Sequence, residues 1–259
     1  MDSYEQFLLA LKQKLDYDLS GYKRKQMERR INSLMGVLGF ADNYDEFVEA
    51  IRKDEQICHR FLDYITINVS EFFRNPTQWE VLQNKILPQL LSKEKSLSFW
   101  SAGCATGEEP YSLAIIMEEL FPAQKYSILA TDCDHGVLQK AKEGFYLARS
   151  VQTIPDKYVY KYFLTKGDRY CIKDELKKKI LFRNHNLLRD EFPKRIDLIL
   201  CRNVVIYFKE EIKEQLYFKF YDALRPGGFL LTGSTEQIIQ VKKIGFETVT
   251  SFFYRRPLL

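Results

Sequence analysis

The sequence lacks the long apolar runs and paired cysteines that mark several classes of protein. No run among its 259 residues approaches the ~20 apolar residues of a membrane span. The N-terminal stretch MDSYEQFLLALKQK has none of the charged, apolar and cleavage regions of a signal peptide. The five cysteines, an odd number, lie far apart with no C-x-x-C pair. We therefore expect free thiols in a reducing cytoplasm.

The sequence has few histidines, and its positive and negative charges nearly balance. The three histidines (His59, His135 and His185) are isolated and lack metal-ligand spacing, so we predict no metal site. Lys and Arg total 39 against 35 Asp and Glu, a net charge of +4, which is not the basic excess of a dedicated DNA-binding protein. A hydrophobic content of 46% and a charged content of 29% indicate a globular chain of one large or two smaller domains.

The first ~70 residues show helical periodicity only. Apolar residues recur at helical spacing in four stripes, and no strand pattern appears before Trp79. We therefore expect an all-helical N-terminal domain with its connector at residues 1–75, followed by a second domain at residues 76–259.

Positive charge is concentrated at residues 21–30 (GYKRKQMERR), which hold five basic residues against Glu28. Lys23 and Arg30 lie seven residues apart, beside an apolar stripe. Such a cluster is most often a solvated face, and it can also be a surface that meets an acidic partner. The spacing alone leaves both interpretations open.

Residues 98–117 (SFWSAGCATGEEPYSLAIIM) have the order strand, glycine loop, helix. Gly103 and Gly107 bracket the loop, and a helix is predicted from about Glu109, with Thr106 and Glu109 spaced as a capping box. This is the opening unit of a doubly wound nucleotide-binding sheet.

The loop is acidic, since it carries Glu108 and Glu109 and no Lys. Two carboxylates would repel a pyrophosphate, whereas they would attract the ammonium and sulfonium groups of S-adenosylmethionine. Alternatively, both carboxylates merely stabilise the helix N-terminus through its dipole. A strand at residues 126–131 then ends at Asp132, which could accept ribose hydroxyls or be an ordinary turn residue. The loop and this acid together favour the cofactor.

The rest of the chain continues the α/β rhythm. Short strands at residues 169–173 and 179–183, separated by a charged turn, are predicted to form a small antiparallel insertion at about residues 155–183, after which residues 180–188 rejoin the main sheet. The apolar run at residues 196–201 is typical of a buried parallel strand. A helix at residues 210–224, a Pro226–Gly228 turn and further strands follow.

The connector at residues 65–79 (ITINVSEFFRNPTQW) sets polar groups among aromatic ones. It can be a packed hinge, or it can fold over a ligand held at the edge of the sheet.

The order helix, L-R-P-G-G, apolar strand resembles the late crossover of the S-adenosylmethionine-dependent methyltransferase sheet. Four stretches together resemble the chemotaxis receptor methyltransferase family, CheR, over nearly the whole chain. They are N-V-S-E-F-F-R (68–74), T-G-E-E-P-Y-S (106–112), C-R-N-V-V-I-Y-F (201–208) and L-R-P-G-G (224–228).

The resemblance implies an α/β, Rossmann-like methyltransferase sheet with a small antiparallel insertion, preceded by a helical domain. It implies methyl transfer from S-adenosylmethionine to glutamate side chains on the cytoplasmic helical bundle of chemoreceptors, giving γ-glutamyl methyl esters and S-adenosylhomocysteine. A cytoplasmic monomer that neither enters the membrane nor binds nucleic acid is expected.

The resemblance also implies the site residues. The implied cofactor-binding set is Asn68, Ser70, Arg74, Glu109, Asp132, Asn186, Leu187, Asn203 and Val204. Glu109 would meet the amino end of the methionine moiety and Asp132 the ribose. Asn186 and Leu187 would flank the adenine. Arg74 and Tyr207 would lie beside the reacting methyl group as catalytic residues, and Arg30 would face the receptor.

Three features depart from the family pattern. Ser70 stands where Thr is usual, Gly36 stands where some relatives carry Arg, and the antiparallel insertion is short. Two other functions are less consistent with the sequence. A nucleic-acid methyltransferase usually carries [D/N]-P-P-[Y/F] where this chain has R-N-V-V. A receptor-binding protein without catalysis would not need the full set of cofactor-contacting residue types.

Overall fold

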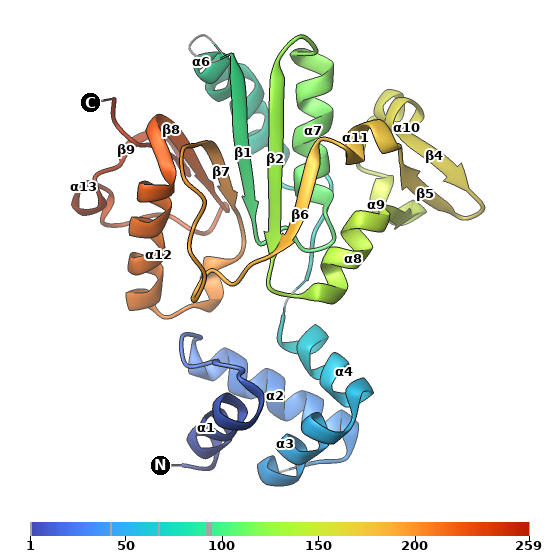
Figure 1. The fold of residues 1–259 in the computed structure, drawn as a ribbon, viewed down its shortest axis with the longest axis vertical. Helices are drawn as coiled ribbons and strands as arrows, with labels where there is room; N and C mark the ends of the chain where they lie inside the picture. The colour runs from blue at the N-terminus through green and yellow to red at the C-terminus, as the bar shows by residue number, and fades with distance from the viewer. Residues whose placement is uncertain (1, 42, 67, 92–94, 259) are drawn as a thin grey trace. The chain divides into compact units, whose positions relative to one another are not determined.

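The computed structural model describes residues 2–41, 43–66, 68–91 and 95–258. Two compact units make up the chain (Figure 1). The first comprises Met1–Asn68 with Tyr207–Lys213, and the second comprises Val69–Ile206 with Glu214–Leu259. Within the described ranges, every helix is too short or too polar to cross a membrane.

The first unit is helical because its apolar residues repeat at helical spacing, and three of its described helices begin with a side-chain cap. Asp2 and Glu5 form a capping box, and Asn43 and Asp54 cap two later helices through their side chains. The buried stripes form a core of their own. The helices are α1 (Ser3–Leu15), α2 (Arg24–Leu38), α3 (Tyr44–Lys53) and α4 (Glu55–Ile65).

The second unit is built on a seven-stranded sheet with the order β6-β2-β1-β7-β8-β10-β9. The first five strands in this order are parallel, and β10 is antiparallel to both of its neighbours. The strands are β1 (Ser96–Ala102), β2 (Lys125–Asp132), β6 (Ile180–Asn184), β7 (Ile196–Cys201), β8 (Leu224–Thr232), β9 (Glu247–Thr250) and β10 (Phe253–Arg255). The expected α/β architecture is confirmed.

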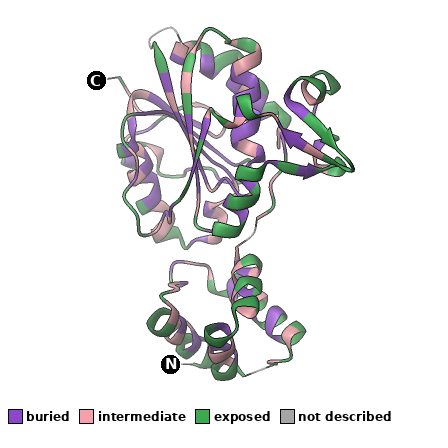
Figure 2. Cartoon of the chain, turned by 45° about the vertical axis from the view of Figure 1, so that its right-hand side comes forward, coloured by how far each residue is buried: buried purple, intermediate pink, exposed green. Residues whose placement is uncertain are grey.

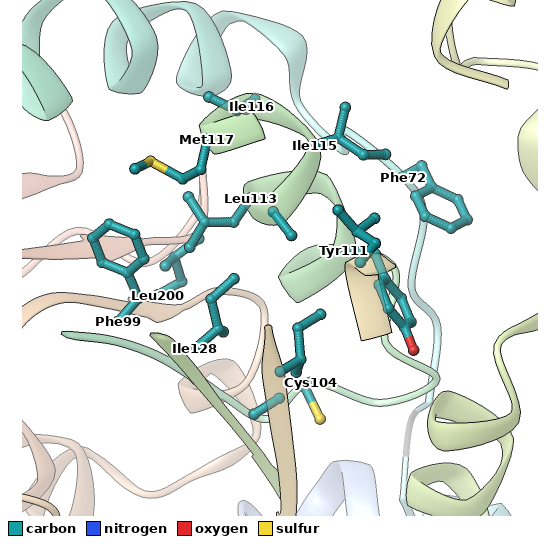
Figure 3. Close-up of a cluster of buried hydrophobic side chains, with 14 of the residues drawn as sticks. Phe72, Phe99, Cys104, Tyr111, Leu113, Ile115, Ile116, Met117, Ile128 and Leu200 are labelled. Atoms are coloured by element: carbon teal, nitrogen blue, oxygen red, sulfur yellow. The ribbon is translucent and has the colours of Figure 1, made fainter. Parts of the chain in front are cut away.

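Helices and short turns connect these strands. They are α5 (Pro76–Val81), the π-helical turn η1 (Leu82–Ile86), α6 (Leu87–Leu91), α7 (Glu108–Leu120), α8 (His135–Glu143), α9 (Ala148–Val151), α10 (Asp156–Tyr162), α11 (Asp174–Lys177), the 3₁₀ turn η2 (Val205–Tyr207), α12 (Glu210–Ala223) and α13 (Val241–Ile244). Buried residues run along the central strands (Figure 2). Figure 3 shows apolar side chains of α7, such as Leu113, beside Phe99, Ile128 and Leu200 of the sheet.

The small antiparallel sheet exists, but its expected pairing is wrong. Its order is β3 (Phe145–Leu147), β5 (Arg169–Ile172), β4 (Phe163–Lys166). Residues 174–177, predicted as a turn, form α11, and β6 pairs in parallel with β2 of the main sheet. The reason is burial: Ile180 and Phe182 of β6 join the main core.

The Pro-Gly-Gly segment is also more regular than expected. Pro226–Gly228 lies inside β8 rather than in a separate turn, at a point where the register between β7 and β8 shifts. Gly227 takes a φ of +79° and donates its N–H to the Arg256 carbonyl at 2.8 Å. The segment therefore forms an irregularity in the pairing of β8 with β7. On its other edge, Gly227 bonds to the chain just after β10.

Candidate cofactor site

The site residues converge because of the strand order. β1 lies between β2 and β7, so the connections of neighbouring strands diverge at this point. In an open parallel sheet, ligands bind beyond the carboxyl ends of the strands at such a switch point. The glycine loop follows β1, Asp132 ends β2, and residues 202–204 follow β7.

Gly103 brings the loop after β1 into contact with the loop after β7. A Cβ atom at Gly103 would lie 2.5 Å from Cγ2 of Val204, and the φ of Gly103 is +85°. The N–H groups of Gly103 and Cys104 both donate to the Thr131 carbonyl, at 2.8 and 2.9 Å. Only glycine fits this close approach without strain.

Asp132 lies beside the same loop. One carboxylate oxygen accepts the Ala105 N–H at 2.9 Å, and the other accepts the Asp134 N–H at 3.0 Å. Burial raises the pKa of Asp132, and these two N–H donors oppose the rise. The Cys133 N–H also bonds to Asp132, and a carboxylate can accept about four hydrogen bonds in all.

The two loop glutamates have separate hydrogen-bond partners. Helix α7 begins at Glu108 with Gly107 as its N-cap, so the predicted Thr106–Glu109 capping box is wrong. The Thr106 hydroxyl instead donates to the Glu108 carboxylate at 2.6 Å, and Ser70 also bonds to Glu108. The N-cap position is taken by Gly107, whose φ is +94°, so Thr106 lies one residue before the N-cap and does not cap the helix. Burial raises the pKa of Glu108.

Glu109 is held by two polar side chains. It accepts the Ser101 hydroxyl at 2.7 Å and lies 3.4 Å from Nη1 of Arg202. Burial raises the pKa of Glu109, and the Arg202 charge opposes this rise. Sequence reasoning gave Arg202 no role, although a charged residue directly after a wholly buried strand is a signal that could have identified it.

Asn203 and Val204 are positioned by a carboxylate that sequence reasoning also missed. The buried Glu236 accepts the N–H groups of Asn203, Gly233 and Ile206 at 2.6, 2.7 and 3.2 Å. Asn203 has a φ of +59°. Its side-chain oxygen Oδ1 is buried without a hydrogen-bond partner among the described residues, and therefore offers an acceptor to a ligand.

Asn186 and Leu187 lie in the turn that follows β6. The Asn186 side-chain oxygen accepts the Leu188 N–H at 2.9 Å, and the Asn186 N–H donates to Asp190 at 2.8 Å. Leu187 is buried. Hydrogen bonds of Asn186 therefore hold the turn, and the apolar side chain of Leu187 lies next to it in the sequence.

The connector is attached to the second unit by its backbone. The Phe73 N–H donates to the Ser112 hydroxyl at 3.0 Å, and the Arg74 carbonyl accepts Nε1 of Trp79 at 3.0 Å. The Arg74 side chain is half-buried and donates to the Val69 carbonyl at 3.2 Å. This segment therefore brings Ser70 and Arg74 into the same unit as Glu109.

Three of the expected site residues belong to the first unit. The Asn68 amide donates to the Thr66 hydroxyl at 2.9 Å, and the Tyr207 carbonyl accepts the Lys23 N–H at 2.8 Å. Arg30 donates to the Tyr64 carbonyl, and its guanidinium carbon lies 5.0 Å from the centre of the Tyr64 ring.

The residues of the second unit fit S-adenosylmethionine. Burial disfavours the ionised form of the Glu109 carboxyl and a nearby positive charge favours it, so a bound ammonium group would stabilise the carboxylate. The unpartnered Oδ1 of Asn203 can accept a further donor, and Asp132 can accept ribose hydroxyls. The described residues contain no group of His, Cys, Asp and Glu side chains arranged to bind a metal ion.

Comparison with known proteins agrees with this geometry. Residues 68–253 match the family profile of the CheR methyltransferase SAM-binding domain, and residues 2–66 match that of the CheR methyltransferase all-alpha domain. A chemotaxis protein methyltransferase of Listeria innocua is 43% identical over 252 residues, covering 97% of this chain and 96% of that protein. One of Borreliella burgdorferi is 36% identical, covering 85% and 83%.

Proposed function

The chain belongs to the CheR family of S-adenosylmethionine-dependent methyltransferases and acts in chemotaxis, and from this premise we propose that its acceptors are glutamate side chains of chemoreceptors. The product would be a γ-glutamyl methyl ester. The observation that carries the proposal is that both parts of the chain match the two domains of this one family, over residues 2–66 and 68–253.

The cofactor would be held by residues that follow the strands of the sheet and by residues of the connector. We assign its methionine end to Glu109, Asn203 and Val204. The ribose is assigned to Asp132 and the adenine to Asn186 and Leu187, while Asn68, Ser70 and Arg74 complete the set from the connector. The burial of Glu109 and the unpartnered oxygen of Asn203 support this assignment.

The reaction needs orientation rather than proton transfer. S-adenosylmethionine supplies a methyl group that its sulfonium sulfur has already activated. A glutamate acceptor is ionised near neutral pH, so no general base is required. Holding a carboxylate oxygen in line with the methyl group can lower the barrier by ~7–11 kcal/mol.

Arg74 and Tyr207 are the residues proposed to hold the acceptor. Burial would raise the pKa of the substrate carboxyl and favour the unreactive acid. The Arg74 guanidinium would oppose this rise, and the Tyr207 hydroxyl would donate a hydrogen bond to the carboxylate. If Tyr207 instead exchanged protons, the activity of Tyr207→Phe would fall steeply and recover at high pH.

The proposed partner is the cytoplasmic helical bundle of a chemoreceptor, approached by the basic side of α2 that includes Arg30. This assignment places the enzyme in the cytoplasm as a monomer without nucleic acid. Charge complementarity with an acidic receptor surface would speed association at low salt.

The test is transfer of labelled methyl groups from S-adenosylmethionine to membranes that contain chemoreceptors. We expect a base-labile label on a membrane protein, because carboxyl methyl esters hydrolyse in base. Membranes without receptors are the control. A base-stable label, or a label on added nucleic acid, would contradict the proposed acceptor while leaving cofactor binding intact.

A further inference from the structure

Arg202 is a buried charge with no assigned part in methyl transfer. Its side chain is only 2% exposed. Nε donates to Oε1 of Gln78 at 3.1 Å, and Nη1 lies 3.4 Å from Oε2 of Glu109. Nη2 donates to Oδ1 of Asn75 at 3.1 Å and also to the Arg74 carbonyl. One guanidinium thus contacts the cofactor-binding acid and the connector at the same time.

The connector side of this network is rigidly supported. The Arg202 guanidinium lies over the Trp79 ring, with 5.4 Å between its central carbon and the ring centre. Nε1 of Trp79 donates to the same Arg74 carbonyl at 3.0 Å. Gln78 donates to the Thr232 carbonyl of β8 at 3.0 Å, which fixes the acceptor that Arg202 uses.

We infer that Arg202 is a positioning residue that couples Glu109, the proposed ligand of the cofactor's amino group, to the placement of Arg74. The guanidinium has five N–H donors in a fixed fork, which allows it to bind both partners at once. A lysine in its place would keep the charge but could not hold all four acceptors. The inference rests on cofactor binding and the assignment of Glu109, and it is independent of which acceptor is methylated.

The charge of Arg202 affects the pKa of Glu109. Burial raises its pKa, Arg202 opposes that rise, and the neighbouring carboxylate of Glu236 adds to it. Burial lowers the pKa of Arg202 itself. Besides Glu109, the charges of Arg74 and Glu236 act on this guanidinium, Arg74 lowering its pKa and Glu236 raising it. Removing the Arg202 charge would raise the pKa of Glu109 further, so the pH dependence of binding an ammonium group would shift toward higher pH.

The test is calorimetric titration of the full chain with S-adenosylhomocysteine from about pH 6 to pH 9. We expect Arg202→Met to bind at least about tenfold more weakly at neutral pH and to recover affinity as the pH rises. Arg202→Lys should retain the wild-type pH profile, because it retains the charge. In both variants, hydrogen exchange of backbone amides at residues 70–78 should be faster than in the wild type.

Arg225 provides the matched control, because it forms another buried pair, with Asp197, at the amino ends of β7 and β8. Arg225→Met should destabilise the fold without altering the pH profile of S-adenosylhomocysteine binding. An Arg202→Met protein with the wild-type profile would overturn the inference, as would an equal change of profile in Arg225→Met.

If Arg202→Met does not fold, two milder variants test whether Arg202 couples Glu109 to the connector. Gln78→Met and Arg202→Lys each remove connector contacts while leaving a charge near Glu109. Unchanged hydrogen exchange at residues 70–78 in both would refute the coupling. Faster exchange in both, with the wild-type pH profile retained, would support it.

Discussion

Gly103 occupies the narrowest point between the loops that follow β1 and β7. The added Cβ of Gly103→Ala would lie 2.5 Å from the Val204 side chain, at a φ of +85°. The left-handed conformation alone costs ~1–2 kcal/mol for a residue with a side chain, and the clash adds to this. We predict a loss of both stability and S-adenosylhomocysteine affinity, measured by urea unfolding and calorimetry.

Gly39 is the control for this substitution. It has the same φ of +85° at the end of α2, but an added Cβ would meet nothing within 4 Å. Gly39→Ala should therefore show the conformational cost and leave S-adenosylhomocysteine affinity unchanged. Equal losses of stability in the two variants would show that the contact with Val204 has no energetic effect.

Glu236 acts through backbone N–H groups rather than through a ligand. Both of its carboxylate oxygens accept hydrogen bonds from the segments at residues 203–206 and 233. In Glu236→Gln, an NH₂ group would replace one oxygen and oppose an N–H donor. Leaving such a donor unsatisfied costs ~1–3 kcal/mol, so we predict a destabilised fold and weaker S-adenosylhomocysteine binding.

Glu247 is the comparison for Glu236, because it pairs with Arg255 at a much more exposed position. Glu247→Gln should change stability by at most ~1 kcal/mol and should not alter binding. Thermal unfolding and calorimetry on both variants separate the two roles. Wild-type affinity in Glu236→Gln would exclude a positioning role for this carboxylate.

Among the elements, β6 and the turn that follows it depend on a buried histidine. The His185 ring packs edge-on against Trp100, and its Nε2 lies 3.1 Å from the Glu191 carbonyl. Burial lowers the pKa of His185 below 6.5, with Arg183 and Lys219 acting in the same direction and Asp190 opposing them. The neutral ring therefore belongs to the folded state.

This pKa shift predicts a pH dependence of stability. Because the pKa is lower in the folded than in the unfolded chain, the unfolded state takes up the proton first as the pH falls. The contribution of His185 is fully present above about pH 6.5, the pKa of the unfolded state, and is lost as the pH falls from there through the lower pKa of the folded state. Urea unfolding at several pH values should show that the free energy of unfolding falls less with decreasing pH in His185→Gln than in the wild type. Parallel profiles for the two proteins would exclude this contribution.

Local sequence patterns predicted the helices and strands better than they predicted which strands pair and which distant side chains meet. The apolar run at residues 196–201 and the glycine loop at residues 103–107 correctly predicted β7 and the start of the helix after β1 to within a residue or so. The expected pairing of β5 with β6 was wrong because β6 pairs with β2 of the main sheet. Strand β5 instead pairs with β4, which directly precedes it, and with the more distant β3. Arg202 was missed for a similar reason, since Gln78 lies 124 positions away.

At the scale of the whole molecule, a net charge of +4 conceals an uneven use of positive charge. On α2, Arg24 pairs with Asp2 and Glu28, and Arg30 bonds to the Tyr64 carbonyl. These two arginines therefore stabilise the helical unit itself. Lys25 and Arg29 of the same helix are exposed, so their charge would be available to a partner in addition to that of Arg30.

This difference gives a prediction for receptor recognition. If the basic side of α2 meets an acidic receptor surface, Lys25→Glu together with Arg29→Glu should slow methylation of receptor-containing membranes severalfold. The effect should diminish at high salt, because screening weakens exposed charges. S-adenosylhomocysteine affinity and thermal stability should be those of the wild type.

The matched charge reversal is Lys53→Glu, at an exposed position on α3 of the same unit. It changes net charge in the same direction but lies outside the basic segment of α2. Equal slowing by the two reversals, normalised per charge, would mean that only the overall charge of the enzyme steers it to the receptor. Slowing confined to Lys25 and Arg29, and absent at high salt, would locate the receptor contact on α2.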